Sequence, residues 1–205
     1  MKFIPVEVSA RHIHLSKDVS DVLFGENYEF SKKKDLSQPG QFACFEKVTI
    51  QSEKNEIKNV TVLGPFREKT QIEISLTDAR KLGVFPPIRE SGDLENSSAC
   101  KITGPKGECT ISEGLIIAKR HIHMSPEDAE GFFVKDNQIV KVLIESAERK
   151  TIFDDVVVRV SEKFSLAMHI DTDEGNAVNF FPDVKARLIY GKNQLQKGYF
   201  LKKYS

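Results

Sequence analysis

The histidines are the residues of this sequence best suited to chemistry. The chain has five of them. Four occur in two copies of the tetrapeptide Arg-His-Ile-His, which pair His12 with His14 and His121 with His123. Residues i and i+2 of a β-strand point to the same face, with Cα atoms about 6–7 Å apart. Each pair can therefore bind one metal ion. Zinc is the metal that neutral imidazoles usually bind in a catalytic site without redox chemistry.

Two further residues are candidate metal ligands. His169 ends a predicted strand, just before a predicted helix. Glu73 lies in a predicted strand in which Gln71, Glu73 and Ser75 share one face. Alone, such a histidine or glutamate also fits a structural role. Five histidines and a carboxylate exceed the needs of one tetrahedral ion but suit two ions with open positions. We therefore expect two zinc ions per chain.

Two Gly-Pro segments are candidates for phosphate binding, residues 64–67 and 104–107. Neither matches a known phosphate-binding loop, and both fit simple turns. Arg67 is the more informative residue, because it lies in the loop that leads to the strand of Glu73. A guanidinium there could offer two N–H donors to a phosphate or a carboxylate.

Alternating hydrophobic residues predict many short strands, among them 6–15, 46–51, 57–63, 71–76, 99–103, 111–124, 138–145, 151–160 and 165–170. Short helices are expected after the capping residues at 77–78, 125–128 and 171–174. We expect a mainly β protein with short capping helices, built as two small β-barrel domains that share a central metal site. Its halves would be 1–90 and 91–205. Because the strands do not alternate with long helices, a Rossmann sheet is not expected.

Composition excludes several classes of function. The 205 residues include 30 Lys+Arg and 30 Asp+Glu, and this zero net charge argues against a nucleic-acid partner. No apolar run is long enough to span a membrane, and no signal peptide is evident. Three cysteines without a Cys-x-x-Cys motif indicate a reduced, cytoplasmic protein. The basic stretch 183–205, after Pro182, fits either a strand that packs back on the core or a partly ordered tail.

Five segments together resemble the phosphate propanoyltransferase family, which consists of zinc-dependent phosphotransacylases. They are residues 8–16, 63–75, 87–94, 120–129 and 168–177. The resemblance implies a reversible exchange between acyl-CoA plus phosphate and acyl phosphate plus CoA. It also implies two β-barrel domains with helical caps and a dinuclear zinc site.

The resemblance further assigns roles to single residues. One zinc ion, which meets the CoA sulfur, would be held by His12, His14 and Glu73. The other, completed by waters or phosphate, would be held by His121, His123 and His169. Arg67 matches the arginine that binds phosphate. Propanoyl-CoA and acetyl-CoA both remain candidate substrates, and a homodimer is left open. Because His12 follows closely on Met1, without the targeting extension of microcompartment members, we expect a cytoplasmic enzyme rather than one associated with a shell.

Three other interpretations stay open on the sequence. A dinuclear zinc hydrolase also uses His-x-His strands, although Leu15 and Met124 here follow the pairs where an Asp-His would be expected. A non-catalytic metal-binding module would need the same ligands. An acyl-cysteine route would require Cys44, Cys100 or Cys109, but none has an activating neighbour in sequence.

Overall fold

The computed structural model describes residues 2–190, which form fourteen strands and four helices. The strands are β1 (Ile4–Ser9), β2 (His12–His14), β3 (Lys32–Asp35), β4 (Phe42–Gln51), β5 (Glu56–Gly64), β6 (Gln71–Glu73), β7 (Ile88–Arg89), β8 (Ser98–Thr103), β9 (Glu108–Ala118), β10 (His121–Met124), β11 (Ile139–Glu145), β12 (Lys150–Val160), β13 (Ala167–Asp171) and β14 (Lys185–Ile189). The helices are α1 (Lys17–Phe24), α2 (Leu76–Leu82), α3 (Pro126–Gly131) and α4 (Thr172–Ala177). None of these helices is long and apolar enough to cross a membrane.

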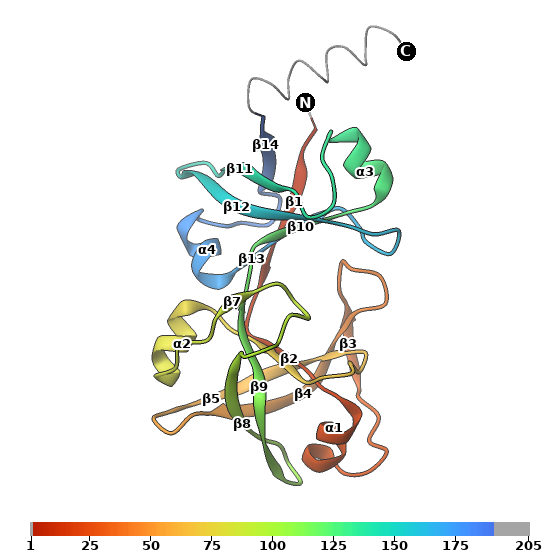
Figure 1. Ribbon diagram of the computed structural model, residues 1–205, viewed down its shortest axis with the longest axis vertical. Coiled ribbons are helices and arrows are strands. Elements are labelled where there is room, and N and C mark those ends of the chain that lie inside the picture. The colour runs from red at the N-terminus through yellow and green to blue at the C-terminus, as the bar shows by residue number, and fades with distance from the viewer. Residues whose placement is uncertain (1, 191–205) are drawn as a thin grey trace, which may run out of the picture. The chain divides into compact units, whose positions relative to one another are not determined.

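One compact unit contains β1 and the strands from β10 to β14, which close into a six-stranded barrel in the order β1-β13-β10-β12-β11-β14 (Figure 1). Its described residues are 2–8, 120–170 and 174–190. The barrel is filled by inward-facing hydrophobic residues from all six strands, including the fully buried Ile122, Val142 and Val158. The outward neighbour of Ile122 on either side is a histidine, so burying the isoleucine turns both imidazoles the other way.

The second compact unit comprises residues 9–119 and 171–173. Its strands also close into a ring of six, because β4 pairs with β5 and β8, β2 pairs with β5 and β6, and β9 pairs with β6 and β8. Strands β3 and β7 lie at the edges of this sheet, on β4 and β9 respectively. Ile13, Val62 and Leu115 are fully buried in its core. Ile13 thus has the same position in this barrel as Ile122 in the other.

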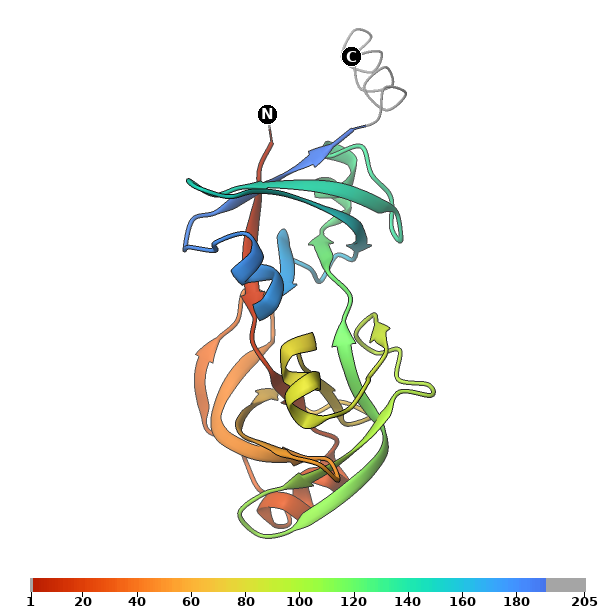
Figure 2. The same ribbon diagram turned by 90° about the vertical axis from the view of Figure 1, so that its left-hand side faces the viewer.

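The two barrels share part of their topology. In each, a His-Ile-His strand pairs in parallel with one neighbour and antiparallel with another, β2 with β5 and β6, and β10 with β12 and β13. Each such strand leads into a helix with a serine at the N-cap, Ser16 for α1 and Ser125 for α3. Each is also preceded, after a break of two residues, by another strand, β1 or β9, as the red and green segments of Figure 2 show.

These preceding strands are exchanged between the repeats. Strand β1 closes the barrel that contains β10, and β9 closes the barrel that contains β2. The compact units therefore differ from the expected halves 1–90 and 91–205, since 91–119 group with the first His-Ile-His strand and 2–8 with the second. The alternating pattern of a strand shows which face is buried but does not reveal which barrel the strand completes.

The predicted fold class is confirmed: the protein is mainly β, with short helices and two closed six-stranded barrels. A metal site shared by the barrels stays a prediction. The expected strands 6–15 and 111–124 are each divided in two by a short break before the histidines. Helix α1 was not predicted. In the basic stretch 183–205, residues 185–189 form strand β14, and residues 191–205 lie outside the described residues.

Candidate functional site

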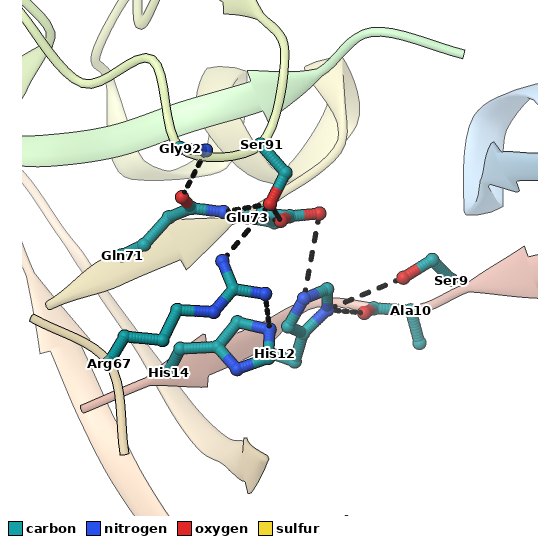
Figure 3. A network of polar contacts seen from close by, with 9 residues as sticks. All are labelled: Ser9, Ala10, His12, His14, Arg67, Gln71, Glu73, Ser91 and Gly92. Carbon is teal, nitrogen blue, oxygen red and sulfur yellow. Dashed lines mark hydrogen bonds and ion pairs between the residues drawn. The ribbon is translucent and has the colours of Figure 1, made fainter. Parts of the chain in front are cut away.

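Strands β2 and β6 bring the first three candidate ligands together. In their antiparallel register His12 lies directly opposite Glu73, and His14 lies on the same face as His12. One nitrogen or oxygen atom from each of the three side chains lies within 4.8 Å of the other two. All three residues are buried. We call His12, His14 and Glu73 the first triad (Figure 3).

The imidazole of His12 is oriented by the residues that precede it in the chain. Its Nδ1 lies 2.9 Å from the carbonyl oxygen of Ala10 and 3.4 Å from the hydroxyl of Ser9. A proton on Nδ1 that is donated to the Ala10 carbonyl leaves the lone pair on Nε2, which lies 3.5 Å from Oε2 of Glu73. Histidines that bind metals are commonly fixed in this way, through the nitrogen that does not bind the metal.

The carboxylate of Glu73 is held by one of its two oxygens. Oε1 accepts hydrogen bonds from the amide of Gln71 and from the hydroxyl of Ser91, at 3.1 Å for the latter. The Gln71 side chain is itself fixed, because its Oε1 accepts from the backbone N–H of Gly92 at 2.8 Å. Figure 3 shows Oε2 left facing His12. The sequence pointed to Glu73 but missed Ser91, although Ser91 lies in the segment 87–94 that carries part of the resemblance.

Arg67 lies against the same triad. Its Nη1 donates to Oγ of Ser91 at 3.0 Å, and its Nη2 donates to Nε2 of His14 at 2.8 Å. Its backbone N–H donates to the carbonyl of Leu15 at 2.9 Å, which fixes the loop beside β2. Gly64 must precede this loop, because a Cβ there would lie 2.2 Å from the ring of Phe42.

A cleft of about 240 Å3 opens beside Arg67 and His14. Its other walls are formed by Pro65 and by the loop that connects β3 to β4, through Pro39, Gly40 and Gln41. A guanidinium at the wall of a cleft can offer N–H donors and positive charge to an anion that enters.

The protonation equilibria of the first triad favour a metal-binding form. Burial lowers the pKa of His14 well below its usual value, and the nearby His12 and Arg67 lower it further, so this imidazole is neutral. Burial would raise the pKa of Glu73, but its ion pair and hydrogen bond with His12 and the charge of Arg67 outweigh that and lower it strongly. Burial opposes protonation of His12, yet Glu73 raises the His12 pKa overall. Because a divalent cation would replace that proton beside the carboxylate, the triad fits a metal ion.

The nitrogen of His14 that can bind a metal ion is Nε2. It lies 2.8 Å from Nη2 of Arg67, which can only donate, so Nε2 of the neutral imidazole carries the lone pair. The same lone pair can bind a metal ion, which would replace the contact with Arg67 and leave that guanidinium N–H for another ligand.

Strands β10 and β13 form a second triad, made of His121, His123 and His169. His121 lies opposite His169 in the antiparallel register, so His169 has the position that Glu73 has in the first triad. The ligand atoms again lie within 4.8 Å of one another. The ring centroids are 4.6 Å apart for His121 and His123 and 5.0 Å apart for His123 and His169. Three imidazoles in this arrangement are the ligand set of open catalytic zinc sites.

The surroundings of the second triad are partly aromatic. The ring of Phe164 lies 4.1 Å from that of His123, centroid to centroid, and the guanidinium of Arg159 lies 5.8 Å from the Phe164 centroid. Oε2 of Glu7, on β1, lies 3.8 Å from Nδ1 of His169. A carboxylate in that position favours the orientation of a metal-binding histidine.

Comparison with known proteins identifies the family. A model of the family described as phosphate propanoyltransferase matches residues 5–181. The chain belongs to the phosphate propanoyltransferase family. A phosphate propanoyltransferase of Thermotoga maritima is 57% identical over 174 residues, which cover 85% of this chain and 83% of that protein. Those of Clostridioides difficile and Listeria monocytogenes are 54% and 48% identical, over 91% of this chain and 89% and 87% of theirs.

As a member of the phosphate propanoyltransferase family, the chain is an acyltransferase. All six predicted ligands are brought together, three in each barrel, and Arg67 lies against the first triad. The other Gly-Pro segment, 104–107, is instead a hairpin turn between β8 and β9, in which the N–H of Gly104 donates to the carbonyl of Gly107.

The cysteines offer little nucleophilic character. Burial raises the pKa of the Cys44 thiol and of the Cys100 thiol to about 11 each. Burial also raises the pKa of Cys109. Because the thiolate is the nucleophile, these environments suppress the reactive form at neutral pH.

Proposed function

We propose that this chain transfers a short acyl group, propanoyl or acetyl, between CoA and inorganic phosphate. The observation that carries the proposal is the first triad with Arg67 beside it, at the wall of a cleft. In this reaction a phosphate oxygen attacks the thioester carbonyl carbon, a C–O bond forms, and the C–S bond breaks with release of the CoA thiolate. The site must therefore stabilise an incoming anion, an oxyanion and a leaving thiolate.

We further propose that each triad holds one zinc ion. The donor sets support this, since imidazole and carboxylate are zinc ligands and each set of three leaves a position open. His12, His14 and Glu73 would hold the zinc that meets the CoA sulfur, and His121, His123 and His169 the zinc that meets phosphate. Bound zinc would supply Lewis acidity, which lowers the pKa of a coordinated thiol and polarises a carbonyl or phosphoryl oxygen.

Arg67 would bind and orient the phosphate. Phosphate carries close to two negative charges near neutral pH, and two N–H groups of one guanidinium can donate to two of its oxygens. The hydroxyl of Ser91, 3.0 Å from Nη1, holds the guanidinium in place before the anion arrives. A donor that is already oriented costs no reorganisation in the transition state.

Direct attack by phosphate is favoured over an acyl-cysteine intermediate. A covalent route needs a thiolate, and burial raises the pKa of all three cysteines. No cysteine belongs to either triad. The substrates are therefore proposed to react with each other rather than in turn with the protein.

An assay of CoA release from propanoyl-CoA and acetyl-CoA, with and without phosphate, tests the proposal. We expect release that depends on phosphate, together with an acyl phosphate that hydroxylamine can trap. A zinc hydrolase would release CoA without phosphate. A non-catalytic metal-binding module would bind zinc but release no CoA. Either of the last two outcomes would overturn the proposal.

A further inference from the structure

An arginine directly precedes each His-Ile-His sequence, and both arginines form ion pairs of the same kind. Arg11, before His12, pairs through Nη1 with Oδ1 of Asp78. Arg120, before His121, pairs through Nε with Oε1 of Glu174 at 3.2 Å. Each pair lies within one compact unit.

The acidic partners occupy equivalent places. Asp78 is the third residue of α2, and Glu174 is the third residue of α4. Asp78 follows Glu73 by the same number of residues as Glu174 follows His169. Each helix follows the strand that supplies the third ligand of a triad: α4 begins directly after β13, and α2 begins after a break of two residues that follows β6. The pairs thus connect the strand with two histidines to the segment with the third ligand.

The burial of the acids distinguishes these pairs from ordinary surface ion pairs. The side chains of Asp78 and Glu174 are only 8% and 19% exposed. By contrast, the glutamate of the Lys69–Glu113 pair is 34% exposed. An exposed pair contributes under about 1 kcal/mol, whereas a buried carboxylate that loses its partner is strongly unfavourable. Arg11 therefore has one strongly preferred position, beside the buried Asp78, and Arg120 has a weaker preference for its position beside the partly buried Glu174.

We propose that Arg11 and Arg120 are positioning residues, each of which fixes the distance between the histidine pair and the third ligand of its own triad. In the antiparallel register the first histidine lies opposite the third ligand, one residue after the arginine. A shift in the register of the strand would break the arginine ion pair and, at the same time, move the histidines away from the third ligand. The inference rests on the proposed zinc sites, because it concerns the geometry that these sites need.

The two pairs differ in a way that gives distinct expectations for lysine. Arg11 meets Asp78 through one terminal nitrogen, which a lysine ammonium can replace. Arg120 uses Nε, and its guanidinium also lies 4.9 Å from the centroid of the Phe153 ring. A lysine cannot reproduce both contacts. Arg11→Lys should therefore retain more function than Arg120→Lys.

The experiment measures zinc affinity in competition with a chromogenic chelator, in full-length proteins that keep one triad each. His123→Ala protein retains the first triad, and His14→Ala protein retains the second. Adding Arg11→Gln should weaken zinc about 10- to 100-fold in the first protein and leave the second unchanged. Adding Arg120→Gln should give the reverse. Lys69→Gln is the matched control, because it breaks an exposed pair, and should change neither affinity.

Thermal melting of the metal-free proteins separates positioning from loss of stability. The double variant Arg11→Gln/Asp78→Asn removes both charges and so leaves no buried carboxylate unpaired. Its melting temperature should approach that of the parent while its zinc affinity stays low. Recovery of zinc affinity in this variant would show that the unpaired charge, not positioning, had caused the loss, and would overturn the inference.

Other outcomes separate this inference from the proposed function. Unchanged zinc affinity in both glutamine variants, or an equal loss at both triads, would overturn the inference alone. Zinc binding by the parent without phosphate-dependent CoA release would overturn the proposed function and still decide the role of the arginines. A parent that binds no zinc would overturn the zinc sites and the inference together.

Discussion

The two triads have one scaffold but different chemical character. In both, a His-Ile-His strand presents two imidazoles, and the antiparallel neighbour supplies the third ligand opposite the first histidine. That third position holds a carboxylate, Glu73, in the first triad and an imidazole, His169, in the second. Three neutral imidazoles leave the full double charge of a divalent ion, whereas a carboxylate halves it. The all-histidine triad should therefore attract an anionic ligand more strongly.

The residues that surround the two triads also differ. The first triad is buried in a network in which Gln71, Ser91 and Gly92 fix the carboxylate directly or through each other. The second has an aromatic neighbour, Phe164, and a half-exposed carboxylate, Glu7, 3.8 Å from His169. A repeated scaffold can thus give two triads of different chemical character through one changed residue and different neighbours.

The largest effects are expected from matched histidine substitutions in the two triads. His14→Ala and His123→Ala should each lower the zinc content by about one ion per chain and remove most of the activity, since each loses a ligand. Metal analysis of the purified proteins and the phosphate-dependent assay measure both quantities. Retention of full metal content and rate by one variant would show that its triad is not a zinc site.

Arg67→Ala should have the next largest effect and would sharpen the contrast, because Arg67 acts at the first triad, where its Nη2 donates to Nε2 of His14. We expect turnover to fall by about 100-fold, equivalent to loss of an oriented charge worth roughly 3 kcal/mol. Arg67→Lys should recover part of that loss, with a raised phosphate KM. Zinc content should stay unchanged, because arginine is not a ligand. Wild-type turnover and phosphate KM in the alanine variant would remove Arg67 from the mechanism.

Much of this site could be predicted from local sequence patterns. His12 and His14 are two residues apart, which places both side chains on one face of a strand. Because the same pattern recurs at His121 and His123, metal binding was a better explanation than a purely structural role for these histidines. Glu73 could be proposed because strand alternation places it opposite buried isoleucines. The roles of Ser91 and Arg11 could not, because their partners lie far away in sequence and meet them only through strand pairing and loop packing. The exchange of β1 and β9 was hidden for the same reason.

Ser91→Ala tests how far the network around Glu73 matters. The variant removes a donor to Glu73 and an acceptor for Arg67. We expect zinc affinity of the first triad to fall about 10-fold, as is usual when the partner of a ligand is lost, and that of the second to stay unchanged. Chelator competition with the single-triad proteins measures both. An equal change at both triads would show that the serine acts on general stability instead.

Glu7→Gln is the counterpart for the second triad, with a smaller effect. Glu7 is 40% exposed and its oxygen is 3.8 Å from His169, so water screens the interaction. We expect zinc affinity of the second triad to fall about threefold, and that of the first to stay the same. The same competition assay applies, and an unchanged second triad would reduce Glu7 to a surface carboxylate.

The smallest effect is expected from removing the cysteines, all three of which lie in the unit of the first triad. If one of them were a nucleophile, the acyl group would pass through a covalent intermediate on that cysteine, and the substrates would not react directly with each other. Burial raises the pKa of Cys44 and Cys100 to about 11, so at neutral pH these thiols stay protonated and only more alkaline solution would expose the thiolate. Cys44→Ala, Cys100→Ala and Cys109→Ala should each keep turnover within about twofold of the parent, because none supplies a reacting atom. Steady-state rates at varied acyl-CoA and phosphate should intersect rather than run parallel in double-reciprocal form. Parallel lines together with loss of turnover in one alanine variant would establish an acyl-cysteine route.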